Sequence, residues 1–549
     1  MSAGLRDVLR TDVTVLIAAI AAAAATMAGA AGVSAPKPAP TLAPKPAPTS
    51  APSALVPVTT IAAVPSFAIV VRDQTALRAA PHEAAPQQAL LWQGEVVEVR
   101  GERIDHLQVW DYQRERGGFV AASRLRRTSL AADDAPELLA VLRFVRDTPG
   151  SEALGIGLAA AWLKAAPAQA VQGAGGAEAF DAIATMADRL AQRASSGSAP
   201  ATSAGASPGN APSRADAALA AHLEVAARYG VAFKSFERDG AMRICYDGEM
   251  FRRVLAMPAA DATQRARAAL GLTRPECIDP ALPVTERQRL DAWRAEVLDR
   301  VDSAQLARTW KSRIAMRRAG VWSALAFQRT RHDDGAQAEA AAKRAIAELA
   351  DVDRSELGDD DDVAWNDAAL RVGASRWAAA PMVAKTARNV RIVTAPGEPG
   401  QTCVSLVDAA KPDRTAPLAR RCTFGVVWAE SAVLNREGNA LALAVQPMEA
   451  WRELWVFTRQ SKGGWSVQML PPATVAPELG YAEFAGWVPG GKQMLVAREA
   501  RGAKGLKHNF EVVRLDTLAT ERQASDPSAL GPFMRWQDAG WKRETVSIR

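Results

Sequence analysis

The stretch Glu95-Val96-Val97-Glu98-Val99 sets the pattern for the first folded part of the chain. Its residues 97–99 alternate between apolar and polar, which is the period of a β-strand with one buried face. Similar short runs are Ala68-Ile69-Val70-Val71, Leu107-Gln108-Val109-Trp110 and Gly118-Phe119-Val120, and glycines separate them. Residues 66–128 are therefore predicted to form a small β-barrel.

These residues resemble the bacterial Src homology 3 (SH3) family. The matching segments follow one another in the order that the family has, namely 76–81, 94–99, Trp110, 118–120 and Leu125. Leu107 stands where a Trp often begins the third strand of that family, which makes any shared ligand groove uncertain. The resemblance implies a domain that binds cell-wall peptides or serves as an adaptor.

Four aromatic residues of this segment are candidate ligand-binding residues: Trp92, Trp110, Tyr112 and Phe119. Flat rings supply a large contact area while losing little conformational entropy on binding. The alternative is that most of these rings fill the core of the barrel.

The first 65 residues contain no pattern of a folded domain. Arg6 and Arg10 precede a charge-free run over residues 13–35, which predicts a signal peptide over residues 1–30. The alternative is an uncleaved inner-membrane anchor, because 23 uncharged residues could span a bilayer. Residues 31–65 repeat a Pro/Ala-rich string and are predicted to form an extended linker. We therefore expect a periplasmic or secreted protein.

The middle of the chain is dominated by helical periodicity. Residues 129–193 are predicted to form a helical segment and residues 214–382 a helical domain. The Ser/Ala/Gly/Pro-rich stretch 194–213 between them is predicted to be a flexible linker. Residues 242–245 and 249–253 are predicted to pair as a hairpin around Asp247-Gly248.

One helix pair in this region resembles a single tetratricopeptide repeat. The residues at the spacing of that family are Trp322, Leu325, Ala326, Ala338 and Ala345. Arg329, Ala342 and Ala350 depart from the pattern, and no second copy lies 34 residues away. We therefore expect an ordinary helical hairpin. The acidic run at 359–362 lacks the spacing of a calcium loop and is expected to begin a helix.

Residues 383–549 change to strand patterns. The segments 434–445 and 487–498 look related, with an offset of 53 residues, and each precedes a second strand. They resemble the blades of TolB-type β-propellers. The length of the region allows only three or four blades, and a closed wheel normally needs at least four, so an open or degenerate stack is an equal alternative. The seven Trp residues from Trp428 to Trp541 could stack on carbohydrate, but packing between sheets is the favoured interpretation.

The four cysteines, Cys245, Cys277, Cys403 and Cys422, are an even number in a chain that is predicted to be exported, which favours disulfides. Of the three possible connectivities, Cys245 to Cys277 and Cys403 to Cys422 respects the predicted domain boundary. No two cysteines are close enough in sequence for a CxxC metal or redox motif.

No motif in the sequence predicts catalysis. The five histidines are scattered, HExxH and GxSxG are absent, and the GxxxxGK match at 486–492 has Gln493 in place of Ser or Thr. We expect no metal and no cofactor. A net charge of +6 over 549 residues argues against nucleic acid as a partner. A membrane contact is expected only if the N-terminal segment is uncleaved.

The sequence thus predicts a multidomain α+β protein with a small SH3-like β-barrel, an α-helical middle region and a C-terminal antiparallel, blade-like β region. The predicted function is that of an exported, non-catalytic envelope protein that binds peptidoglycan or another envelope protein. One alternative is a cell-wall hydrolase, or its accessory subunit, with an unrecognised active site in residues 214–382. The other is a structural scaffold for protein partners.

Overall fold

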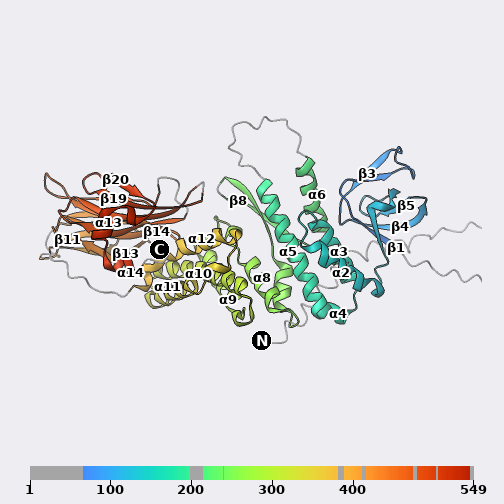
Figure 1. The fold of residues 1–549 in the computed structure, drawn as a ribbon, viewed down its shortest axis with the longest axis horizontal. Helices are drawn as coiled ribbons and strands as arrows, with labels where there is room; N and C mark the ends of the chain where they lie inside the picture. Colours follow the sequence, from blue (N-terminus) through green and yellow to red (C-terminus); the bar gives the residue numbers. More distant parts are fainter. Residues whose placement is uncertain are drawn as a thin grey trace, which may run out of the picture. The chain divides into compact units, whose positions relative to one another are not determined.

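The computed structural model describes residues 66–197, 214–238, 240–380, 389–410, 416–473, 479–502 and 505–544 (Figure 1). The chain divides into two compact units, Met1–Ala260 and Asp261–Arg549. The predicted signal peptide, the Pro/Ala-rich linker and residues 198–213 of the second linker lie outside the described residues. None of the described helices is both long and apolar enough to cross a membrane.

The first unit begins with a seven-stranded antiparallel sheet in the order β3-β2-β6-β5-β4-β1-β7. Its strands are β1 (Ser66–Val70), β2 (Thr75–Arg78), β3 (Gln87–Leu91), β4 (Val96–Arg103), β5 (His106–Asp111), β6 (Arg116–Ala121) and β7 (Leu125–Thr128). One core contains apolar residues from all seven strands, so the sheet curls around it: Ala68, Val70, Leu77, Leu91, Val97, Leu107, Val109, Val120 and Leu125. The predicted strand positions are confirmed.

The sheet does not close into the expected barrel. Strands β3 and β7 are its two edges, and neither has a second neighbouring strand among the described residues. Pairing is weakest between β2 and β6, which meet at Arg78 and Phe119 only. A barrel requires pairing around its whole circumference, and the described strands β3 and β7 do not pair with each other.

The sheet is followed by helices and one hairpin that belong to the same unit. Their bounds are α2 (Ala135–Arg146), α3 (Glu152–Ala165), α4 (Ala168–Gln172), α5 (Ala174–Gly197), α6 (Arg214–Arg228), β8 (Phe233–Arg238), β9 (Ala241–Tyr246) and α7 (Glu249–Ala256). Helix α5 continues four residues into the predicted linker and is buried there at Ala194 and Ser195. The Ser195 hydroxyl bonds both the carbonyl and the amide of Ile244 in β9. Helix α5, before the linker, therefore packs against strand β9, which follows it.

The predicted hairpin around Asp247-Gly248 is wrong in its second half. Strand β9 pairs with β8 instead, with Phe233 opposite Tyr246. Gly248 has a φ of +87° and precedes α7 as its N-cap, and the Asp247 carboxylate accepts the amide hydrogen of Glu249. The Asp-Gly pair thus starts a helix, because the same local geometry serves a helix cap as well as a turn.

The second unit begins with five long helices. They are α8 (Ala262–Leu272), α9 (Val284–Asp299), α10 (Arg308–Arg331), α11 (Gly335–Ala350) and α12 (Asp359–Ser375), and the short 3-10 helix η6 (Arg376–Ala379) follows. Helices α10 and α11 form the predicted hairpin, with Ala338 and Ala345 buried. The acidic run is the first turn of α12, as predicted, although Asp361 is buried and pairs with Arg313.

The rest of the second unit is mainly an antiparallel β region, as predicted, and β15 and β17 pair in parallel over a short stretch. A three-stranded sheet contains β10 (Val390–Pro396), β11 (Thr402–Asp408) and β12 (Ala419–Thr423). A larger sheet contains two consecutive meanders, each of four strands. The first meander is β13 (Val426–Leu434), β14 (Ala440–Met448), β15 (Trp451–Arg459) and β16 (Trp465–Leu470), and the second is β17 (Gly480–Val488), β18 (Gln493–Gly502), β19 (Gly505–Arg514) and β20 (Thr520–Ala524).

These sheets are stacked in layers. Val404 and Leu406 of the three-stranded sheet pack against Leu443 of the first meander. The opposite face of that meander packs against the second meander, with Val456 and Val496 in one buried cluster. The short helices α13 (Gly531–Trp536) and α14 (Ala539–Glu544) cover the far face of the second meander. Four of the seven Trp residues of this region are buried: Trp428, Trp451, Trp455 and Trp541.

The two segments that look related in sequence also touch in space. The turn before β14 meets the turn before β18, where the Glu437 carboxylate accepts the amide hydrogen of Gly490 at 2.8 Å. The Asn439 side chain donates to the carbonyl of Gly491 at 3.3 Å. The 53-residue offset therefore corresponds to equivalent strands of the two meanders.

Candidate functional site

Three of the four predicted aromatic residues lie on or beside the outer face of strands β4, β5 and β6. Side chains alternate along a strand, so the core position of Val109 places Trp110 on the outer face. By the same rule the core position of Val120 places Phe119 on that face. Tyr112 follows the end of β5 and is 38% exposed.

Trp110 occupies the centre of a row across three strands. It lies opposite Glu98 on β4 and opposite Gly117 on β6. A Cβ atom at Gly117 would lie 3.2 Å from Cε3 of the Trp110 ring, so the glycine gives the ring room to lie close to the sheet. The Arg100 guanidinium lies over this ring, 4.4 Å from its centroid. The guanidinium and the bare backbone at Gly117 therefore hold the ring in place.

Glu98 forms hydrogen bonds with two neighbours of this row. Its Oε2 atom accepts hydrogen bonds from Nε of Arg100 at 3.0 Å and from the Tyr112 hydroxyl at 2.8 Å. The hydrogen bond to Glu98 is the main reason that the pKa of Tyr112 is raised, and burial adds to the effect. Tyr112 therefore stays protonated at neutral pH and keeps donating to Glu98. We call Glu98, Arg100, Trp110, Tyr112, Gly117 and Phe119 the outer surface.

Trp92 has a different role from the other three rings. It lies in the connection between β3 and β4, and its ring meets that of His222 on α6 edge to face, with centroids 6.4 Å apart. The core cluster of the sheet contains none of the four rings. The alternative interpretation is that these rings fill the core. The structure places them around the core instead, where they are partly buried or exposed.

An ion network joins the sheet to helix α6. Glu95, at the start of β4, has a 5% exposed side chain and accepts from Arg114 at 3.0 Å and from Arg228 at 2.6 Å. Burial alone would lower the pKa of Arg114, but the carboxylates of Glu95 and Asp111 raise it. The Tyr229 hydroxyl donates to the Gly94 carbonyl at 2.6 Å. These contacts hold the strand that carries Glu98 and Arg100.

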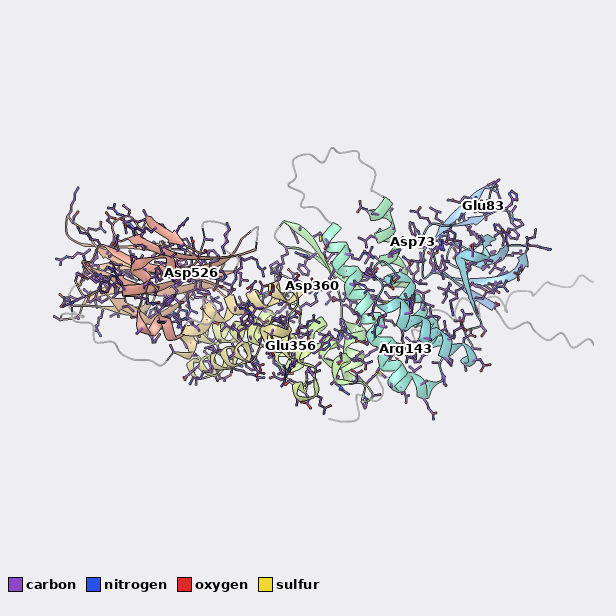
Figure 2. The ribbon with its side chains drawn as sticks, viewed as in Figure 1. Asp73, Glu83, Arg143, Glu356, Asp360 and Asp526 are labelled. Atoms are coloured by element: carbon purple, nitrogen blue, oxygen red, sulfur yellow. A yellow bond between two sulfur atoms is a disulfide. The ribbon has the colours of Figure 1, made fainter. Side chains whose placement is uncertain are left out.

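A second polar cluster lies at the same border. Asp73, in the loop between β1 and β2, accepts from Nε2 of His222 at 2.9 Å and from the Gln93 side chain at 3.1 Å. Figure 2 shows Asp73 between the sheet and the helices of this unit. Burial alone would raise the pKa of Asp73, but the bond and charge of His222 lower it. Because His222 is only 3% exposed, this pair suits a structural role better than a catalytic one.

The second unit contains a buried polar row that sequence reasoning missed. Arg452, Tyr481, Glu499 and His508 lie side by side on four neighbouring strands, β15, β17, β18 and β19. The Tyr481 hydroxyl donates to Glu499, and Nδ1 of His508 lies 3.1 Å from Oε1 of Glu499. The bond to Glu499 raises the pKa of His508 despite partial burial. Only His508 of this row reaches solvent appreciably, with 39% exposure.

Arg452 also takes part in a fully buried ion triad. Glu483 accepts from Nη2 of Arg452 at 2.9 Å and from Nε of Arg376 at 2.6 Å. Burial alone would raise the pKa of Glu483, but the two arginines lower it, so the carboxylate is charged. Arg452 donates in addition to the Gly373 carbonyl in α12 at 2.7 Å. The triad therefore fixes α12 and η6 on the sheet.

The described residues do not assemble a recognisable catalytic centre. No group of three His, Cys, Asp or Glu residues among them could hold a metal ion. The GxxxxGK match spans the end of β17 and the following turn, where it does not open a helix. The histidines have separate partners. His106 pairs with Asp105 and His332 bonds the Gln328 carbonyl, whereas His222 pairs with Asp73 and His508 with Glu499.

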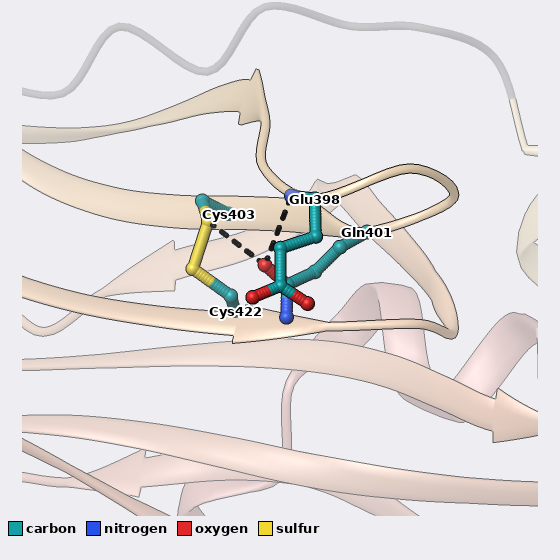
Figure 3. The surroundings of a disulfide bond; sticks show 4 residues. All are labelled: Glu398, Gln401, Cys403 and Cys422. Atoms are coloured by element: carbon teal, nitrogen blue, oxygen red, sulfur yellow. Dashed lines mark hydrogen bonds between the residues drawn. A yellow bond between two sulfur atoms is a disulfide. The ribbon is translucent and has the colours of Figure 1, made fainter.

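Cys403 and Cys422 form the predicted disulfide. They lie opposite each other on β11 and β12, and Figure 3 shows the bridge between the two strands. Cys245 and Cys277 are also disulfide-bonded, and none of the four cysteines is a free thiol. Two disulfides are consistent with an exported protein.

Comparison of the chain with protein-family models, with curated proteins and with solved structures finds no significant match. The outer surface is thus interpreted from its own geometry. Sequence reasoning identified its three rings but missed Glu98, Arg100 and Gly117. The alternation in 97–99 places Glu98 on the outer face, and the Gly117-Gly118 pair marks a part of the strand without side chains. Contact between these residues could not be predicted without the strand register.

Proposed function

We propose that this chain is an exported, non-catalytic envelope protein that binds the peptide part of the bacterial cell wall through the outer surface. The observation that carries the proposal is the partly exposed Trp110 ring, which is fixed between Gly117 and the Arg100 guanidinium. Aromatic rings held at a surface beside polar groups are typical of ligand-binding sites. The SH3 resemblance of residues 66–128 supports the same choice.

The size of the outer surface favours a short peptide over a folded protein partner. A stable protein interface buries about 800 Å² on each side. A completely buried aromatic side chain accounts for only about 150–250 Å², and Trp110 and Phe119 are already partly covered. An extended peptide of a few residues matches an area of this size.

The second unit is proposed to be a scaffold of blade-like sheets. Two four-stranded meanders pack face to face, and their equivalent turns touch through Glu437 and Gly490. This arrangement supports an open stack of propeller-type blades. The two disulfides support a periplasmic or secreted location.

Sedimentation of the full chain with insoluble peptidoglycan tests the proposal. We expect wild-type protein to enter the pellet. The bound fraction of the Trp110→Ala variant should be at least about fivefold smaller. The control is Phe144→Ala on α2, which removes another aromatic residue, 82% exposed, outside the outer surface. Equal loss in both variants, or no pelleting of the wild type, would reject the proposal.

The alternative functions give different results with the same protein. A hydrolase would clear peptidoglycan in a zymogram, and clearing that survives purification would replace the binding proposal. A scaffold for envelope proteins would yield defined protein crosslinks in intact cells while failing to pellet with the wall.

A further inference from the structure

The Arg100 guanidinium is presented to solvent in one fixed orientation. Its side chain is 44% exposed. Its Cζ atom lies over the Trp110 ring, 4.4 Å from the centroid, and Glu98 holds Nε and Nη2 through the single oxygen Oε2, each at 3.0 Å. Arginine normally loses considerable side-chain freedom when it binds a ligand. Here much of that freedom is already lost in the free protein.

We infer that the outer surface recognises a free carboxylate on its peptide ligand, through Arg100. This inference rests on the proposed function and names the chemistry of the ligand. A guanidinium has five N–H donors, and Glu98 engages those on the Nε side. The Tyr112 hydroxyl also interacts with this guanidinium. The part of the guanidinium that is exposed can still pair with an incoming carboxylate, which matches the spacing of two parallel N–H donors. An uncharged glycan offers no group of this geometry.

The neighbouring residues fit the rest of such a ligand. Phe119 lies two residues beyond Gly117 on the same face of β6, so it is a diagonal neighbour of Trp110. A small apolar side chain next to the carboxylate can contact both rings. Glu98 also lowers the net charge of the site, which disfavours highly charged anions such as polyphosphates and favours a single carboxylate.

The test compares three preparations of cell wall in the sedimentation assay with the full chain. They are intact peptidoglycan, peptidoglycan whose carboxylates are amidated, and chitin as a bare glycan that has neither peptides nor carboxylates. We expect wild-type binding to fall at least about fivefold on amidated wall and on bare glycan. Binding of the Arg100→Gln variant to intact wall should be lower by a similar factor, and amidation of the wall should reduce its binding little further.

The matched control is Arg103→Gln, which removes another exposed arginine from the same strand. We expect it to bind intact wall as the wild type does, and thermal unfolding should confirm that both variants fold. Binding that is insensitive to amidation, or an equal loss in both variants, refutes the carboxylate inference and leaves the proposed function standing. Absence of wild-type binding to intact wall refutes the proposed function and this inference with it.

Discussion

The substitution Glu483→Gln should destabilise the second unit strongly. The side chain of Glu483 is 3% exposed and lies between Arg376 and Arg452, which are 6% and 0% exposed. Burial lowers the pKa of Arg452 to about 10, so Arg452 is still charged at neutral pH. Removing the negative partner of a buried ion pair costs about 3–5 kcal/mol, because positive charge is left uncompensated. With a denaturant slope of about 3 kcal/mol per M, the urea midpoint should fall by roughly 1–1.7 M.

Urea unfolding followed by circular dichroism and by Trp fluorescence measures this change, and two transitions are expected because the chain has two units. The control is Glu437→Gln, whose carboxylate accepts only a turn amide, and its midpoint should move by less than about 0.4 M. A triple variant that replaces Glu483, Arg376 and Arg452 with apolar residues should lose less stability than Glu483→Gln alone. A decrease of the urea midpoint below about 0.3 M for Glu483→Gln contradicts this reasoning. A triple variant that is less stable than Glu483→Gln contradicts it as well.

Three further predictions concern packing, pH and covalent links. Gly94→Ala should lower the thermal midpoint of the first unit by several degrees, because φ is +88° and a Cβ would lie 2.2 Å from the Ala153 carbonyl oxygen; an unchanged midpoint would argue against this close approach. The pKa of His508 is raised in the folded state, so its stabilising contribution is complete below about pH 6.5 and is lost as pH rises through the folded pKa. His508→Gln should remove this dependence from urea midpoints measured between pH 6 and 9, and an unchanged pH profile would contradict the assignment. A non-reduced digest should contain the Cys403–Cys422 crosslink, and reduction should cost about 3 kcal/mol; free thiols at these positions would exclude the bridge.

Local patterns predicted most of the strands and helices correctly. The alternation in 97–99 and the equally short runs around it required strands, and the spacing of apolar residues required helices α2, α3 and α5. The acidic run at 359–362 was predicted to begin a helix because carboxylates stabilise the first turn. These features depend on residues that are close in sequence, so the sequence alone contains enough information.

Features that depend on distant residues were predicted less well. The barrel was expected from strand lengths, but closure requires pairing between the edge strands β3 and β7, which are not neighbours in the sheet that the described residues form. Asp247-Gly248 serves a hairpin turn and a helix start equally well, and strand β8 decided which of them forms. The buried triad could not be foreseen, because Arg376 and Glu483 are separated by 107 residues.

The candidate site was predicted in part for the same reason. Trp110 and Phe119 were found because large rings near strand ends are noticeable in a sequence. The polar partners Glu98 and Arg100 look like ordinary surface charges until the register places them beside Trp110. Trp92 was grouped with the other rings by proximity in sequence, but it contacts His222 on a helix that begins 122 residues later.

Amide hydrogen exchange of the full chain, measured with and without soluble cell-wall peptides, tests the binding surface most directly. We predict slower exchange in peptides that cover residues 96–121, where strands β4, β5 and β6 carry the outer surface, and little change in the second unit. Protection confined to residues 383–549, or no protection anywhere at saturating concentrations of the peptides, would contradict the account.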